Sequence, residues 1–205
     1  MFDRSNTQAA LRVIEETKRR FLNEFLDDED DEGAAFLRPF LDHIELVSSS
    51  GVMAQFPSSQ GPAALASAAS TVLTLLYARS MSRLPARFRE GLGDSFFGLA
   101  GLGLGYLEQL REVSAELDAG VADSDIEFLE LLAPFFLGSE MSPKNKAFVD
   151  NVMERMGARN ANEFLIVLFT QVGLSERFCS ELMNKSDRIM EAWFADLVKL
   201  MGDDD

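Results

Sequence analysis

The stretch PAALASAASTVLTLLYARSMSR, residues 62–83, has no charged side chain before Arg79 and is apolar or small on nearly every face. A helix that is apolar all round must be buried, because every face would otherwise expose apolar side chains to water. Pro62 suits the first position of such a helix, since an N–H at that position would have no intrahelical partner. We therefore expect a central buried helix that begins at Pro62 and runs to about Arg83.

The segment that follows, DSFFGLAGLGLGYLEQLREV at 94–113, is unusually rich in glycine. Its glycine spacing differs from the dinucleotide-binding fingerprint, and no strand-like pattern surrounds it. Its uncharged part, 95–107, is shorter than the roughly 20 residues that a membrane-spanning helix needs. Three readings stay open: a helix whose glycines allow a close neighbour, an irregular loop, and a hairpin that seeks lipid or an apolar ligand. We favour the first.

As a helix, this segment would place several glycines along one face. Each glycine in a helix interior costs up to roughly 1 kcal/mol relative to alanine, so a row of them needs compensation from close packing. The preceding helix carries its own stripe of small residues, and an antiparallel hairpin that turns near Leu84-Pro85 would bring the two stripes together. The predicted helix-packing seam consists of Ser67, Ser70, Thr74, Gly98, Gly101 and Gly105.

On both sides of this hairpin, 62–117, the periodic segments also indicate helices, and no useful strand alternation appears. The acidic run 27–33 is predicted to be a linker, and the Ser-, Gly- and Pro-rich stretch 48–61 a loop. A C-terminal helical part is expected at 124–201, before a disordered acidic tail at 202–205. The sequence thus predicts an all-α fold, a single-domain bundle of seven or eight helices around a central hydrophobic helical hairpin.

The composition limits the kinds of partner. A formal charge of −15 over 205 residues opposes binding to nucleic acid, because the phosphate backbone repels an acidic surface. The single cysteine, Cys179, cannot form an internal disulfide, and the amino-terminal residues lack the apolar region of a secretory signal. These features favour a cytoplasmic protein. A DNA-mimicking acidic inhibitor is an alternative that we rank low.

No pattern of residues indicates catalysis, a cofactor or a metal. His43 is the only histidine, so every Ser-His-Asp or Cys-His arrangement would have to use it, and no carboxylate precedes it at metal-ligand spacing. We expect a short helix after Pro39 that carries His43 at a partly exposed position. The predicted protein is therefore not an enzyme and has no catalytic, cofactor-binding or metal-binding residues.

Two groups of side chains are candidates for binding a partner. Four arginines are concentrated near the hairpin turn, where they pair either with the protein's own acidic segments, 27–32 or 118–130, or with an acidic partner or lipid headgroup. The Met-rich edge of the last helix either packs in the core or contacts another subunit, and we favour the subunit contact. The candidates are Arg79, Arg83, Arg87, Arg89, Met183, Met190 and Phe194.

These features favour a non-catalytic role in protein–protein interaction, as an adaptor, chaperone-like or assembly protein that self-associates. The expected partner is a protein whose identity the sequence does not give. The alternative is a peripheral membrane or apolar-ligand binding protein that uses the 62–110 hairpin. We rank membrane contact below protein binding, because the net charge of −15 opposes approach to an anionic membrane.

Overall fold

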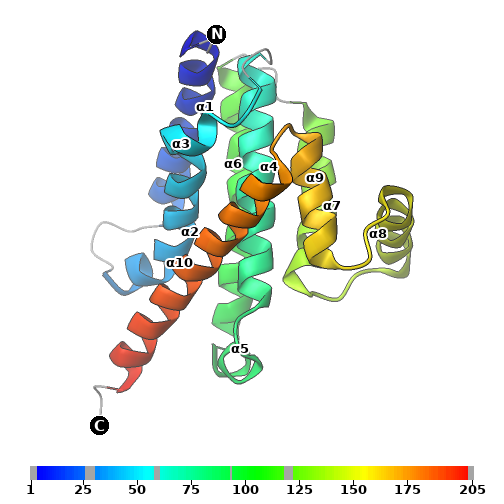
Figure 1. Ribbon diagram of the computed structural model, residues 1–205. Helices are drawn as coiled ribbons and strands as arrows, with labels where there is room; N and C mark the ends of the chain where they lie inside the picture. The colour runs from blue at the N-terminus through cyan, green and yellow to red at the C-terminus, as the bar shows by residue number, and fades with distance from the viewer. Residues whose placement is uncertain (1–3, 26–30, 58–60, 93, 118–121, 203–205) are drawn as a thin grey trace.

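The computed structural model describes residues 4–25, 31–57, 61–92, 94–117 and 122–202, and this part of the chain forms ten helices and no strand (Figure 1). The helices are α1 (Arg4–Phe25), α2 (Asp31–Ser48), α3 (Ser50–Met53), α4 (Pro62–Ser82), α5 (Ala86–Leu92), α6 (Asp94–Glu116), α7 (Asp123–Leu137), α8 (Pro143–Met156), α9 (Ala161–Gln171) and α10 (Glu176–Gly202). The predicted all-α bundle is confirmed. Two short helices raise the count above eight, because α3 lies in the predicted loop and α5 in the predicted turn.

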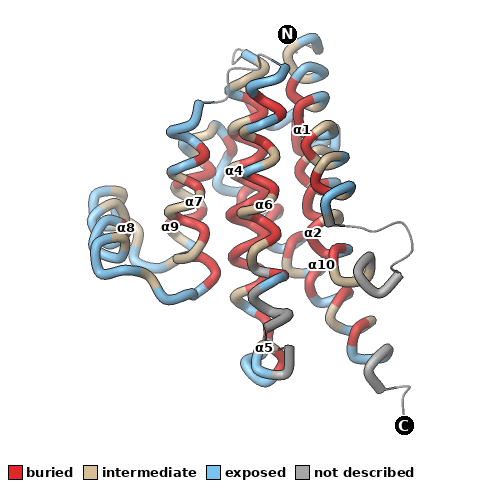
Figure 2. Tube along the Cα trace, turned by 180° about the vertical axis from the view of Figure 1, so that it is seen from behind, coloured by how far each residue is buried: buried red, intermediate tan, exposed pale blue. Residues whose placement is uncertain are grey.

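Helix α4 is the centre of the bundle, as its sequence predicts. It is buried almost continuously from Leu65 to Met81. Helices α1, α2, α6, α7 and α10 all pack against it, and Figure 2 shows buried residues along the sides that these helices turn inward. None of the described helices has both the length and the apolar content needed to cross a membrane.

Aromatic rings from four helices meet in the core beside α4. Phe40 of α2 is the middle ring, with its centroid 4.9 Å from Tyr77 of α4, 5.1 Å from Phe21 of α1 and 5.7 Å from Tyr106 of α6. The Tyr77 hydroxyl donates a hydrogen bond to the Leu99 carbonyl at 2.9 Å. Tilted and edge-to-face contacts of this kind add to the stabilisation from burial, so they fix how α1, α2 and α6 sit around α4.

Helices α4 and α6 form the predicted hairpin, but the glycines predicted to contact α4 are the wrong ones. Gly98 is exposed and Gly101 half-buried, and a Cβ added at either would meet nothing within 4 Å. The glycine that faces α4 is Gly103, where a Cβ would lie 3.7 Å from Cγ2 of Thr74 and 3.8 Å from Cδ1 of Tyr77. The close approach of the two helices therefore occurs one helical face away from the predicted seam.

The rest of the seam is also divided between different neighbours. Ser70 and Thr74 are buried as predicted, but the Ser67 hydroxyl donates to Asp125 of α7 at 2.8 Å. Gly105 is half-buried. Large side chains decide the rotation of α6, because burying them contributes more than bringing glycine backbones together. Among the α6 residues whose side chains the structure describes, the buried ones are Leu99, Leu102, Gly103, Tyr106, Leu107, Leu110, Val113 and Ser114.

Helix α2 corrects two predictions at once. It begins at Asp31, inside the predicted acidic linker, and it continues through Pro39 rather than starting after it. Carboxylates in a first turn are favourable, because the amino end of a helix carries partial positive charge. Pro39 has no N–H for the Ala35 carbonyl one turn earlier, and the indole N–H of Trp193 donates to that oxygen instead, at 3.0 Å. Residues 26–30 lie outside the described part.

The C-terminal helices, predicted over 124–201, extend from Asp123 at the start of α7 to Gly202 at the end of α10. The Ser142 side chain accepts from the Asn145 amide at the start of α8, and the Asn160 side chain does the same for Glu163 at the start of α9. Gly138 and Gly157, with φ of 69° and 71°, end α7 and α8 in the left-handed conformation that favours glycine. In the predicted tail, Gly202 is the last residue of α10, and 203–205 lie outside the described residues, as do 58–60 of the predicted loop.

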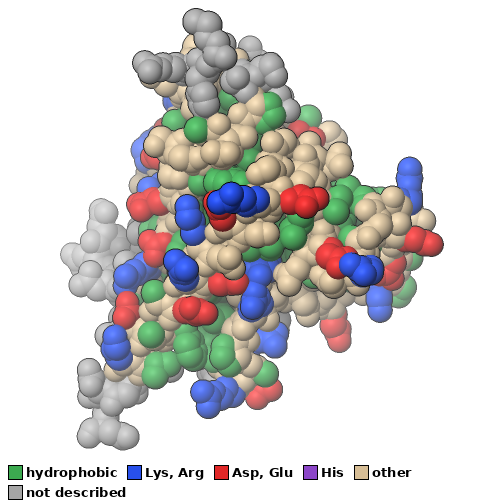
Figure 3. Space-filling view, in the orientation of Figure 1, with side chains coloured by type: hydrophobic (Ala, Val, Ile, Leu, Met, Phe, Trp, Pro, Cys, Tyr) green, Lys and Arg blue, Asp and Glu red, His purple; other side chains and the backbone are tan. Residues whose placement is uncertain are grey.

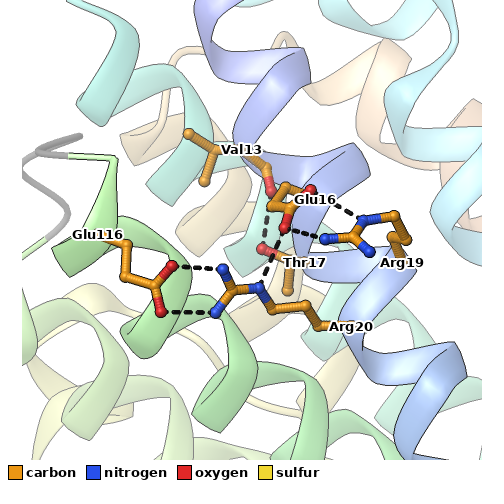
Figure 4. A network of polar contacts seen from close by, with 6 residues as sticks. All are labelled: Val13, Glu16, Thr17, Arg19, Arg20 and Glu116. Carbon is orange, nitrogen blue, oxygen red and sulfur yellow. Dashed lines mark hydrogen bonds and ion pairs between the residues drawn. The ribbon is translucent and has the colours of Figure 1, made fainter.

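A surface ion-pair network joins α1 to the carboxyl end of α6 (Figure 4). Arg20 donates through both terminal nitrogens to Glu116, with Nη1 at 2.7 Å, and through Nε to Glu16 at 3.1 Å. Arg19 donates to the same Glu16 carboxylate at 2.6 and 3.0 Å. The hydrogen bonds from Arg19 and Arg20 lower the pKa of Glu16 to about 2. Arg20 also offsets the unfavourable position of Glu116 in the last turn of α6.

Candidate functional site

The first predicted arginine, Arg79, is not available to a partner. It is 5% exposed, and it donates from Nη1 to Asp187 of α10 at 2.7 Å and from Nε to Asn162 of α9 at 2.8 Å. A guanidinium this deeply buried requires such partners, because an unpaired charge in the interior is strongly destabilising. Arg79 therefore joins α4 to α9 and α10, and its predicted role in partner binding is wrong.

The other arginines lie nearer the surface at the α5 end of the bundle. The Arg83 side chain is 54% exposed and donates from Nη1 to Asp187 at 2.8 Å. Arg87 is exposed and Arg89 is half-buried. Asp187 therefore accepts from a buried arginine and from an exposed one. The interpretation that the arginines pair within the chain holds for Arg79 and Arg83, but their partner lies on α10 rather than in 27–32 or 118–130.

A chain of polar side chains lies next to this ion pair. His43 is fully buried, so its predicted partial exposure is wrong. Its Nδ1 lies 2.5 Å from the Pro39 carbonyl oxygen, and its Nε2 lies 2.6 Å from Oγ of Ser186 on α10. Ser186 Oγ in turn lies 2.5 Å from Oγ of Ser80 on α4. Burial lowers the pKa of His43 to about 4, so the imidazole is neutral at pH 7.

A groove of about 240 Å³ opens where this polar chain reaches the surface. Its wall on α10 carries an acidic pair, Asp187 and Glu191, and an apolar pair, Met190 and Phe194. Figure 3 shows hydrophobic side chains gathered between the lower half of α10 and α5, with charged side chains of both signs around them. The groove is lined by Ser80, Arg83, Leu84, Pro85, Asp187, Met190, Glu191 and Phe194.

The Met-rich edge of α10 is mostly used within the chain. Met183 is buried, so the predicted subunit contact is wrong for that side chain. Met190 is 4% exposed but lines the groove, so its contact with a partner stays a prediction. Trp193 is buried as well. The wide apolar face is needed because α10 crosses α2, α4 and α9. Phe194 is the partly exposed member: its ring packs on Phe88 with centroids 4.5 Å apart, and it lines the groove.

Two other features of the described residues were candidates for a functional site, the thiol of Cys179 and a metal-binding cluster. Cys179 is buried, and burial raises the pKa of its thiol to about 11, so it stays protonated at neutral pH. No cluster of three or more His, Cys, Asp or Glu side chains in the described part is arranged to hold a metal ion. The groove and the polar residues beneath it are therefore the candidate site.

Sequence reasoning found Arg83, Met190 and Phe194 but missed Ser80, Ser186, Asp187 and Asn162. One signal was available for part of the site: Arg79 is the charged residue of α4, whose other side chains are all uncharged. A charge in a helix buried on all sides must find a counter-charge elsewhere in the fold. Nothing local identifies Asp187 as that counter-charge, since the two residues are 108 positions apart.

The arrangement is suited to binding a ligand. The groove combines apolar surface, a fixed guanidinium and a buried hydroxyl, and such elements recognise a ligand by shape, charge and hydrogen bonding. Comparisons of the chain with known protein families, curated proteins and solved structures find no match. Function must therefore be inferred from the site itself.

Proposed function

We propose that the protein is a non-catalytic binding protein, of the adaptor, chaperone-like or assembly type, which holds a segment of a partner protein in this groove. The observation that carries the proposal is the position of Arg83, a half-exposed cation fixed by Asp187 at the edge of an apolar hollow. An apolar surface beside a fixed charge is a common arrangement in the centre of protein interfaces.

The size of the groove favours a peptide segment over a larger cofactor. Small-molecule sites usually enclose about 300–1,000 Å³. This groove measures about 240 Å³ and is open to solvent along Arg83 and Glu191, which suits one or two side chains of a longer chain. Its apolar wall comes from Met190 and Phe194 on α10 and from Leu84 and Pro85 after α4.

Arg83 is suited to a carboxylate of the partner. Its Nη1 is bonded to Asp187, which holds the side chain in place and lowers the conformational entropy lost when a ligand binds. The guanidinium has further N–H groups, and their fork matches a carboxylate. Arg87 adds a second exposed cation at the same end of the molecule. A partly apolar segment with one carboxylate at Arg83 is therefore the partner that this surface fits.

A peptide selection tests the proposal. Random peptides displayed through their amino termini, with free carboxyl termini, are selected on immobilised wild-type protein. We expect enriched sequences that combine an apolar residue with a carboxylate, and binding that falls at least about tenfold in Arg83→Glu and in Phe194→Glu. Arg177→Glu is the matched control, because it makes the same charge change at an exposed residue that pairs with Glu181 of its own helix, α10.

The proposal fails if no sequence is enriched, or if the enriched peptides bind Arg83→Glu and Phe194→Glu as tightly as the wild type. Circular dichroism of each variant checks that the fold is retained. Light scattering tests the predicted self-association. Flotation with anionic vesicles at low salt tests the alternative lipid role of the 62–110 hairpin, which is less favoured because α4 would have to leave the centre of the bundle.

A further inference from the structure

The proton positions in the polar chain follow from its hydrogen bonds. The Pro39 carbonyl can only accept, so Nδ1 of His43 carries the proton and donates to it. Because the imidazole is neutral, Nε2 has a lone pair and accepts from the Ser186 hydroxyl. Ser186 has then used its one proton, so the contact between Ser186 and Ser80 requires Ser80 to donate. The chain runs in one direction, from Ser80 to Pro39.

This direction fixes what Ser80 can offer to a ligand. Ser80 is 2% exposed and is the least exposed residue that lines the groove. Its proton is committed to Ser186, so only lone pairs of Oγ are left, and Ser80 is a hydrogen-bond acceptor in the groove. Arg83, one helical turn later, has only donors. A ligand must therefore present a donor to Ser80 and an acceptor, preferably an anion, to Arg83.

The two requirements must be met within a short distance. Ser80 Oγ contacts Ser186 and Arg83 Nη1 contacts the adjacent residue Asp187, so both groups lie against the same short stretch of α10. One residue of an extended chain spans about 3.3–3.6 Å. The donor and the anion of the ligand thus belong to one residue or to neighbouring ones. Met190 and Phe194 on the α10 wall favour a ligand that also carries an apolar group on this residue or on its neighbour.

We infer that the groove recognises the carboxyl-terminal residue of its partner, with an apolar final side chain. Its backbone N–H donates to Ser80 Oγ, its terminal carboxylate accepts from Arg83, and its side chain lies on Met190 and Phe194. All three groups branch from one Cα, so they fit the short spacing and the volume of about 240 Å³. An internal acidic residue carries its carboxylate on one or two extra methylenes. This inference rests on the proposed function.

Defined peptide probes test the inference. We would measure, by fluorescence anisotropy, dye-labelled hexapeptides that end in Phe, Leu, Met, Lys or Glu, each as the free acid and as the amide. Free acids ending in Phe, Leu or Met should bind at least about tenfold tighter than their amides, because a hydrogen bond to a charged group is lost on amidation. In Arg83→Gln the difference between acid and amide should fall below about twofold, whereas Arg177→Glu should retain it.

A second probe tests whether Ser80 acts as a hydrogen-bond acceptor toward the ligand. Replacing the last peptide N–H by an ester oxygen places an acceptor against the acceptor Ser80 and should weaken wild-type binding about tenfold. In Ser186→Ala the Ser80 hydroxyl no longer donates to Ser186 and can donate to the ester. The loss of affinity caused by the ester should therefore shrink to about threefold or less. A purely structural role of Ser186 would weaken both probes equally.

The outcomes separate the two proposals. Binding of acid and amide with equal affinity, abolished by Phe194→Glu, would overturn carboxyl-terminal recognition and leave groove binding intact. An ester that binds the wild type as tightly as the peptide would overturn the role of Ser80. No binding by any probe would overturn the groove itself as a peptide site. A dimer in the absence of peptide, dissociated by Phe194→Glu, would identify a second copy as the occupant and also overturn the inference.

Discussion

The bond from Trp193 to the Ala35 carbonyl should be measurable as a coupling between Trp193 and Pro39. Pro39 lacks the N–H that would normally bind this carbonyl, and the indole of Trp193 supplies the donor at 3.0 Å. Trp193→Phe keeps an aromatic ring but removes that donor. Leaving a partly buried carbonyl unpaired costs about 1 kcal/mol, at the low end because Ala35 is only half-buried. The smaller ring adds a packing loss of about 1–2 kcal/mol.

The expected destabilisation of Trp193→Phe is therefore about 2–3 kcal/mol in the wild-type background. In a Pro39→Ala background the new N–H can bond to the Ala35 carbonyl within α2, so the same substitution should cost only the packing part. The coupling in this double-mutant cycle is about 1 kcal/mol. Urea unfolding followed by circular dichroism at 222 nm measures it, since tryptophan fluorescence is lost in the variant.

Equal costs of Trp193→Phe in the two backgrounds would refute this reasoning. The Trp193 indole would then act through packing alone, and the tolerance of α2 for an internal proline would need another cause. Phe88 provides a control for the packing part, because its ring contacts Trp193 edge-on with centroids 6.1 Å apart and takes no part in the hydrogen bond. Phe88→Leu should lower stability by the same amount with Pro39 or Ala at position 39.

Three further predictions follow from the packing and the polar network. Gly103→Ala should stabilise the protein by up to about 1 kcal/mol, because a Cβ there meets its neighbours at ordinary contact distance, whereas Gly103→Leu should overpack and cost about 1–3 kcal/mol in urea unfolding. Arg79→Met should cost about 3 kcal/mol by leaving Asp187 without its buried partner, while Arg83→Gln should leave the melting temperature nearly unchanged. The pKa of His43 is about 4 in the fold and 6.5 when unfolded, so its contribution is complete above pH 6.5 and lost as the pH falls towards 4. The loss is about 3 kcal/mol, and this part of the pH dependence should vanish in His43→Gln.

The central position of α4 could be predicted from the sequence, because its burial does not depend on which helices surround it. A segment that is apolar on every face must be enclosed, whichever helices enclose it, and the structure surrounds α4 with five of them. The rotation of α6 could not be predicted in the same way. A helical wheel shows that Gly98 and Gly101 share a face, but not which face the bundle buries, and the large side chains at Leu99, Leu102 and Tyr106 decided it.

The candidate site was predictable only where a single residue carries its own signal. Arg83 stands out because it is a cation near a turn, and Phe194 because it lies on a wide apolar face. The polar chain gives no such signal, since His43 and Ser186 are 143 positions apart and each looks like an ordinary polar residue of an amphipathic helix. Their meeting depends on α10 crossing α2 and α4, which is a property of the assembled bundle.

Asp187 links the stability of the bundle to the shape of the groove. Both of its carboxylate oxygens accept hydrogen bonds from buried Arg79, which requires a counter-charge, and Oδ2 also accepts one from Arg83, which faces solvent. The buried ion pair therefore sets the position of the exposed guanidinium, and the neighbouring Ser186 sets the proton of Ser80 in the same groove. A site built in this way should keep its geometry in the absence of a ligand, because the interactions that hold it also hold α10 against α4.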